Sequence, residues 1–161
     1  MITKIPIKII PIENDGFHLM IEIFINEQAA NMIIDTGASR TVFDSNRIMK
    51  FVSDENLEFE KNEKLSTGLG TNSLESQAIE LEKIQLGELE IEKYKAVVLD
   101  MSHINQSYSA IKIPEIDGVL GGDLLKKYKA NISYQSKILK LKFKKFQTQL
   151  TASIKPENQN I

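Results

Sequence analysis

Apolar and polar residues alternate with a period of two along much of this chain, which predicts a mostly β protein. The alternation runs through residues 17–25 and returns through residues 29–34, so the polar residues between them form the turn of a hairpin. Two further hairpins are predicted, residues 79–86 with 89–99 around Gly87, and residues 132–134 with 138–143 around Gln135-Ser136. A helical pattern runs from Asp123 to Lys129, where Asp123 is placed to cap the helix, and Asp44-Ser45-Asn46 could cap a shorter helical turn through Met49.

The N-terminal residues are apolar enough to raise the question of a signal peptide. Lys8 and two prolines interrupt them, however, and no small-residue cleavage site follows. Ile5, Ile7 and Ile9 alternate with other residues, as in a strand. No apolar run is long enough to cross a bilayer, so the expectation is a cytoplasmic protein without a membrane partner.

Composition narrows the possible functions. The 161 residues predict one domain over residues 1–146, followed by a polar tail over residues 147–161. A net charge of −2 gives no case for a nucleic-acid partner, and lysines 140, 142 and 144 indicate a solvated strand face. The absence of cysteine excludes disulfides, thiol catalysis and zinc-thiolate sites. His18 and His103 do not have metal-ligand spacing, so no metal and no cofactor are expected.

The segment Met32-Ile33-Ile34-Asp35-Thr36-Gly37-Ala38-Ser39 is the strongest candidate for chemistry. Two β-branched residues indicate a buried strand that delivers Asp35 to a fixed place at the edge of the core. Gly37 allows a second chain to approach closely, and the Thr36 hydroxyl can both donate and accept a hydrogen bond. An incidental turn is the alternative, because Asp, Thr and Gly are all common turn residues.

Aspartic proteolysis needs two carboxylates that face each other, and this segment occurs once in the chain. Two carboxylates held about 3 Å apart cannot both ionise, so they share one proton. Such a pair can act as a base toward water and as an acid toward a peptide carbonyl. An active enzyme would therefore be a symmetric dimer that contributes one Asp35 from each chain.

A second motif strengthens this interpretation. Val119-Leu120 runs directly into Gly121, and the helical pattern of Asp123-Leu124-Leu125 follows. Together the two segments resemble the retropepsin-like aspartic proteases, the single-domain relatives of pepsin, and the bacterial members more than the viral ones. The resemblance extends from about Phe17 to Phe143. It implies a closed β-barrel half of the pepsin or retropepsin type, with one or two short helices, expected as a symmetric homodimer. No motif predicts the dimer interface.

The resemblance also implies a function. It implies an aspartic endopeptidase in which Asp35, Thr36 and Gly37 form the catalytic turn and a peptide or protein is the substrate. Substrate would be bound by Ala38 and by a flap that contains Gly68, Leu69 and Gly70, although these glycines also fit a plain surface loop. The alternative function is a catalytically silent module of the same fold that dimerises or binds extended peptides.

Overall fold

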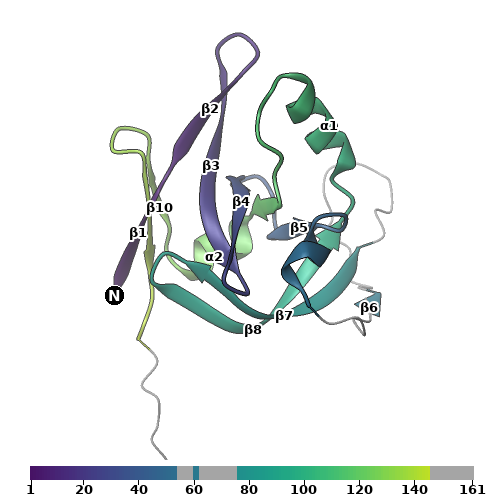
Figure 1. The fold of residues 1–161 in the computed structure, drawn as a ribbon. Helices are drawn as coiled ribbons and strands as arrows, with labels where there is room; N and C mark the ends of the chain where they lie inside the picture. Colours follow the sequence, from purple (N-terminus) through teal and green to yellow (C-terminus); the bar gives the residue numbers. More distant parts are fainter. Residues whose placement is uncertain (54–59, 62–75, 146–161) are drawn as a thin grey trace, which may run out of the picture.

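A closed barrel of six strands forms the body of the protein in the computed structural model, which describes residues 1–53, 60–61 and 76–145 (Figure 1). The strand order is β3-β4-β9-β5-β8-β7, and β7 pairs with β3 again through Phe24↔Gln85 and Ile25↔Ile84. These strands are β3 (Gly16–Ile25), β4 (Gln28–Ile34), β5 (Val42–Asp44), β7 (Gln77–Leu86), β8 (Leu89–Leu99) and β9 (Gly118–Leu120). Strand β2 (Lys8–Ile12) extends the barrel sheet beside β3, and β6 (Glu60–Lys61) extends it beside β7.

A separate three-stranded sheet has the order β1-β11-β10 and lies to the left of the barrel in Figure 1. Its strands are β1 (Ile2–Pro6), β10 (Asn131–Ser133) and β11 (Ile138–Lys142), all antiparallel. The amino group of Met1 donates to the carbonyl of Phe143 at 2.7 Å, and the Phe143 amide donates back to Met1 at 3.0 Å. The first strand of the chain is therefore paired inside its own protomer.

The predicted alternation decides which side chains form the core. On β11, Leu139 and Leu141 are buried while Lys140 and Lys142 are exposed, so the predicted solvated lysine face is confirmed. Full burial of one such leucine stabilises the fold by about 1.5–3 kcal/mol. The three predicted hairpins are confirmed as β3–β4, β7–β8 and β10–β11. The predicted N-terminal strand is present as two strands, β1 and β2, which belong to different sheets.

Two α-helices and one 3₁₀ turn complete the described residues, namely α1 (Ser102–Ala110), α2 (Gly122–Lys127) and η1 (Ile48–Phe51). Helix α1 was not predicted, because its sequence is mostly polar and no side chain caps its N-terminus. His103, expected in a polar connection, lies in this helix. Among the residues that the structure describes, no helix is long and apolar enough to cross a membrane. The predicted tail, residues 147–161, falls outside the described residues.

Candidate active site

Asp35 lies directly after β4, where the chain leaves the core. Ile33 and Ile34 are buried, whereas Asp35 is exposed. The Asp35 amide donates to the carbonyl of Leu120 on β9 at 3.0 Å, which continues the sheet pairing by one residue. The strand therefore fixes the backbone of Asp35 and leaves its side chain at the surface, as the sequence predicted.

The turn after Asp35 orients its carboxylate. Oδ1 of Asp35 accepts hydrogen bonds from the amides of Gly37 at 2.9 Å and Ala38 at 3.2 Å. A Cβ at position 37 would lie 3.3 Å from this same oxygen, so any side chain there would crowd the carboxylate. Thr36 is exposed beside it. The structure thus brings Asp35, Thr36, Gly37 and Ala38 together in one tight turn at the protein surface.

Strand β9 supports this turn from behind. It lies between β4, with which it pairs in parallel through Ile34↔Leu120, and β5, with which it pairs antiparallel through Val42↔Val119. Gly118 and Gly121 at its two ends have no space for a side chain. A Cβ at Gly118 would lie 2.4 Å from the carbonyl oxygen of Val42, and one at Gly121 would lie 2.4 Å from the carbonyl of Arg40. The second sequence motif is therefore the strand behind the Asp35 turn.

The start of helix α2 is hydrogen-bonded to the end of the Asp35 turn. The Gly122 amide donates to the carbonyl of Ala38 at 2.7 Å. Thr41 is 2 % exposed, and its hydroxyl donates to Oδ1 of Asp123 at 2.7 Å while accepting from the Gly121 amide at 3.0 Å. The prediction that Asp123 caps α2 is wrong, because Gly121 is the N-cap and makes no side-chain cap bond. Asp123 lies in the first turn and accepts from Thr41 instead.

A pocket of about 550 Å³ opens beside Asp35 and Thr36. Its other walls are mostly apolar. Strands β4 and β9 form part of them, and the remainder includes Phe17 and His18 from β3, Ile104 and Tyr108 from α1, and Ile132 and Tyr134 from β10 and the residue after it. His18 Nδ1 is hydrogen-bonded to the Tyr108 hydroxyl, and burial raises the pKa of this phenol. Sequence reasoning assigned these histidine and tyrosine side chains only packing roles, because no spacing links positions 90 residues apart.

A family model described as aspartyl protease matches residues 21–124, more than half of the chain. The chain belongs to the aspartyl protease family. The matched segment contains both β4 with Asp35 and β9 with the start of α2. A comparison with curated protein sequences finds no match.

Solved structures show the same fold for this aspartyl protease family member. A retropepsin-like aspartic protease from Rickettsia conorii is 22 % identical, with 88 % of this chain and 91 % of that chain covered and a TM-score of 0.52. The protease of EIAV, solved in complex with the inhibitor HBY-793, is 18 % identical over 77 % of this chain and 99 % of that chain, with a TM-score of 0.48. The retroviral protease-like domain of Ddi1 from Leishmania major is 15 % identical over 77 % and 87 %, with a TM-score of 0.45. The family model and the likeness to the Rickettsia conorii structure confirm the predicted retropepsin-like barrel.

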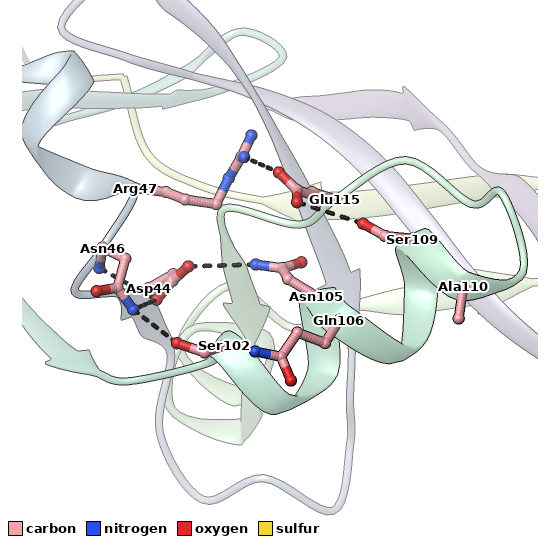
Figure 2. A pocket seen from close by; sticks show the side chains of 9 residues that line it. All are labelled: Asp44, Asn46, Arg47, Ser102, Asn105, Gln106, Ser109, Ala110 and Glu115. Atoms are coloured by element: carbon pink, nitrogen blue, oxygen red, sulfur yellow. Dashed lines mark hydrogen bonds and ion pairs between the residues drawn. The ribbon is translucent and has the colours of Figure 1, made fainter.

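A second, polar pocket of about 630 Å³ lies at the opposite end of β9 from the Asp35 turn (Figure 2). Asn105 of α1 donates from Nδ2 to the buried Asp44 carboxylate at 3.2 Å and to the carbonyl of Ile116 at 3.0 Å. The Ile116 amide donates back to Oδ1 of Asn105 at 2.8 Å. These bonds attach α1 to β5 and to the segment that leads into β9, so in this aspartyl protease family member they also position Ile104 and Tyr108 beside Asp35.

Asp117, directly before β9, is the second buried carboxylate at this end of the strand. It is 2 % exposed and accepts from the Asn31 amide at 2.8 Å, from Arg47 Nε at 2.8 Å and from Lys50 Nζ at 2.6 Å. Two cations and one amide compensate for its burial, which an unpaired carboxylate could not tolerate. The buried carboxylates of Asp44 and Asp117 therefore all have hydrogen-bond partners, and these bonds hold α1, η1 and the neighbouring strands together.

The flap expected from the sequence was assigned to three residues between the two motifs. Gly68, Leu69 and Gly70 lie outside the described residues.

Proposed function

We propose that this chain is an aspartic endopeptidase whose active site is completed by a second copy of itself. The observation that supports this most directly is the Asp35 turn. It presents one exposed carboxylate, held by the Gly37 and Ala38 amides, on a strand that the fold fixes from both sides. A carboxylate held in this way at the surface is available to meet an identical one across a two-fold axis.

In the proposed reaction, the two Asp35 carboxyl groups share one proton and hold a water molecule between them. The ionised carboxylate takes a proton from the water molecule while the water oxygen attacks the peptide carbonyl carbon. The protonated carboxyl gives its proton to the carbonyl oxygen, which forms a neutral tetrahedral diol. The proton taken from water is then transferred to the leaving amine nitrogen as the C–N bond breaks. At the same time a hydroxyl of the diol gives its proton to the other Asp35 carboxylate, which yields the carboxylic acid product and restores the proton that the pair shares.

Neighbouring residues have supporting roles in this proposal. Thr36 is exposed next to Asp35 and would brace the paired turns through its hydroxyl, which can donate and accept at once. Gly37 and the half-buried Ala38 would form the floor on which an extended peptide lies. Gly68, Leu69 and Gly70 would belong to a flap that covers the peptide and excludes water.

The test is Asp35→Asn, which keeps the shape of the side chain but removes its charge. We expect loss of cleavage by about 10²–10⁴-fold on a mixed peptide library near pH 5, since general acid and base chemistry is removed together. The matched control is Asp15→Asn, an exposed aspartate in the β2–β3 turn, which should leave cleavage unchanged. Both variants should unfold at the wild-type denaturant concentration, because neither position is buried.

Two results would contradict the proposal. Cleavage retained in Asp35→Asn would show that another group performs the chemistry. A wild-type protein that neither cleaves the library nor binds a statine-type inhibitor, which mimics the tetrahedral intermediate, would favour the silent binding module.

A further inference from the structure

We propose that the outer face of the three-stranded sheet binds an anionic membrane surface, with its lysines against the lipid headgroups. This face consists of the side chains of β1, β10 and β11 that point away from the core, and its charged members are Lys4, Lys140 and Lys142. None of them lines the pocket beside Asp35, so the inference goes beyond the proposed function and does not depend on it. A peripheral contact of this kind needs no membrane-spanning segment.

The net charge of −2 conceals a strong separation of charge along the chain. Residues 1–12 and 124–145 contain ten lysines and no aspartate or glutamate, so the side chains of these two segments carry a net charge of +10. The side chains of all other residues together carry −12. The two basic segments lie at opposite ends of the sequence, and the pairing of β1 with β11 brings them together in one sheet. Such asymmetry is typical of a protein that binds an anionic partner on one side.

The strand register concentrates three of these lysines on the outer face. Lys4 on β1 is directly opposite Lys140 on β11, and Lys142 lies two residues further along the same strand. The Cβ atoms of directly opposite residues are about 5 Å apart, and those of diagonal neighbours about 7–8 Å. All three lysines are exposed, and no carboxylate of the described residues forms an ion pair with any of them. Like charges directly opposite each other destabilise a sheet, so an anionic partner would relieve a repulsion that the free protein carries.

The other residues of the face favour a bilayer over a nucleic acid or a protein. Ile2 is 57 % exposed directly opposite Lys142, and an apolar side chain beside lysines can enter the boundary between headgroups and acyl chains. The three strands contain no arginine for bidentate contacts with phosphate and no aromatic residue on which a base could stack. Lysine is also depleted in protein–protein interfaces. Lysines attract the diffuse negative charge of an anionic leaflet without any need for a shaped pocket.

The position of the face leaves the Asp35 turn accessible when the protein is bound. Ile132 on β10 lines the pocket beside Asp35, and its partner in the register is Leu139, which is buried. Successive residues of a strand point to opposite faces of a sheet, so Lys140 points away from the side on which Ile132 lines the pocket. A protein held to a membrane by its lysines would therefore keep the Asp35 side open to a peptide and to a second copy.

The experiment measures co-sedimentation of the full chain with vesicles of phosphatidylglycerol and phosphatidylcholine at low salt. We expect the double variant Lys140→Gln/Lys142→Gln to bind about 10–30-fold more weakly than the wild type. The matched control is Lys93→Gln/Lys112→Gln, which removes the same charge from exposed lysines outside the two basic segments and should bind within about twofold of the wild type. Circular dichroism checks the fold, and Lys4→Gln alone, expected to weaken binding about fivefold, replaces the double variant if that variant folds poorly.

Three results would overturn the proposal. The first is a wild type that does not bind these vesicles at low salt, or that binds vesicles of phosphatidylcholine alone equally well. The second is an equal loss of binding in the two double variants, since net charge and not this face would then decide the affinity. The third is displacement from the vesicles by double-stranded DNA or polyglutamate at the same concentration of negative charge. Ile2→Thr should weaken vesicle binding several-fold, and Asp35→Asn should bind vesicles as the wild type does, whether or not the wild type cleaves peptides.

Discussion

Thr41→Val is the most direct test of how the Asp35 turn is held. Valine has nearly the same shape as threonine, so the change removes the hydroxyl with little change in packing. The hydroxyl donates to the Asp123 carboxylate and accepts from the Gly121 amide, at a residue that is 2 % exposed. A hydrogen bond to a charged group contributes about 1.5–3 kcal/mol, and a buried amide left without a partner costs about 1–3 kcal/mol. We therefore expect the free energy of unfolding to fall by about 3–5 kcal/mol.

This loss is a large part of the 5–15 kcal/mol or so that stabilises a typical domain. The assay is urea unfolding followed by circular dichroism, at a protein concentration where the chain is monomeric by sedimentation. Thr36→Val is the control, because it is the same chemical change five residues earlier, on an exposed side chain. It should alter the free energy of unfolding by less than about 0.5 kcal/mol. Equal stability of the two variants would refute the idea that Thr41 braces the turn.

Two further predictions concern packing and pH. Gly118→Ala places a Cβ 2.4 Å from the Val42 carbonyl oxygen and should lower the free energy of unfolding by about 3 kcal/mol or more. Gly16→Ala is the control, because its nearest atoms lie at 3.6 Å, and it should lower this free energy by much less. Equal urea midpoints for the two variants would show that a side chain at position 118 is not crowded. Burial, with the nearby Asp123 carboxylate, raises the pKa of Tyr94 above its ordinary value of 10.0. The unfolded chain then loses this proton before the folded one, so the contribution of Tyr94 to stability is fully present below about pH 10 and is lost as the pH rises above it. Tyr94→Phe should make this fall shallower in alkaline unfolding curves, and an unchanged slope would show that Tyr94 does not contribute to it.

The hairpins could be predicted from the sequence because each contains its own local signal. Residues 17–34, 79–99 and 132–143 combine alternation with a short polar or glycine turn, and each forms the expected pair of strands. In these segments the partner of each strand is its neighbour in the chain, so local pattern is sufficient.

The arrangement around Asp35 could not be derived from local pattern. Strand β9 is only three residues long and is buried on both faces, so it shows no alternation. Its place between β4 and β5 was not predicted from the sequence. Helix α1 gave no apolar stripe, because its buried residues are Asn105 and Tyr108, and the asparagine is stabilised there by Asp44 and Ile116. A polar side chain that is buried with its partners has no signature in a hydropathy pattern.

Asp123 shows how a correct local rule can give the wrong role. An aspartate before Leu-Leu-Lys-Lys is a good cap in isolation. In the fold, the helix begins one residue earlier, at Gly122, and the carboxylate is used by Thr41, which is distant in sequence. Only the three-dimensional structure brings that donor close enough to compete.

The same long separation has a consequence for the order in which the protein folds. Thr41 and Asp123 are 82 residues apart, and the three strands behind the catalytic turn join residues from both ends of that interval. Contacts between residues so far apart require closure of a long loop, so they form late in folding and after the local hairpins. During synthesis on the ribosome, Asp35 emerges before the segment from Gly118 to Asp123, so its turn has no support until that segment has also emerged. The nascent chain therefore carries Asp35 for some time without the strand and helix that hold its turn.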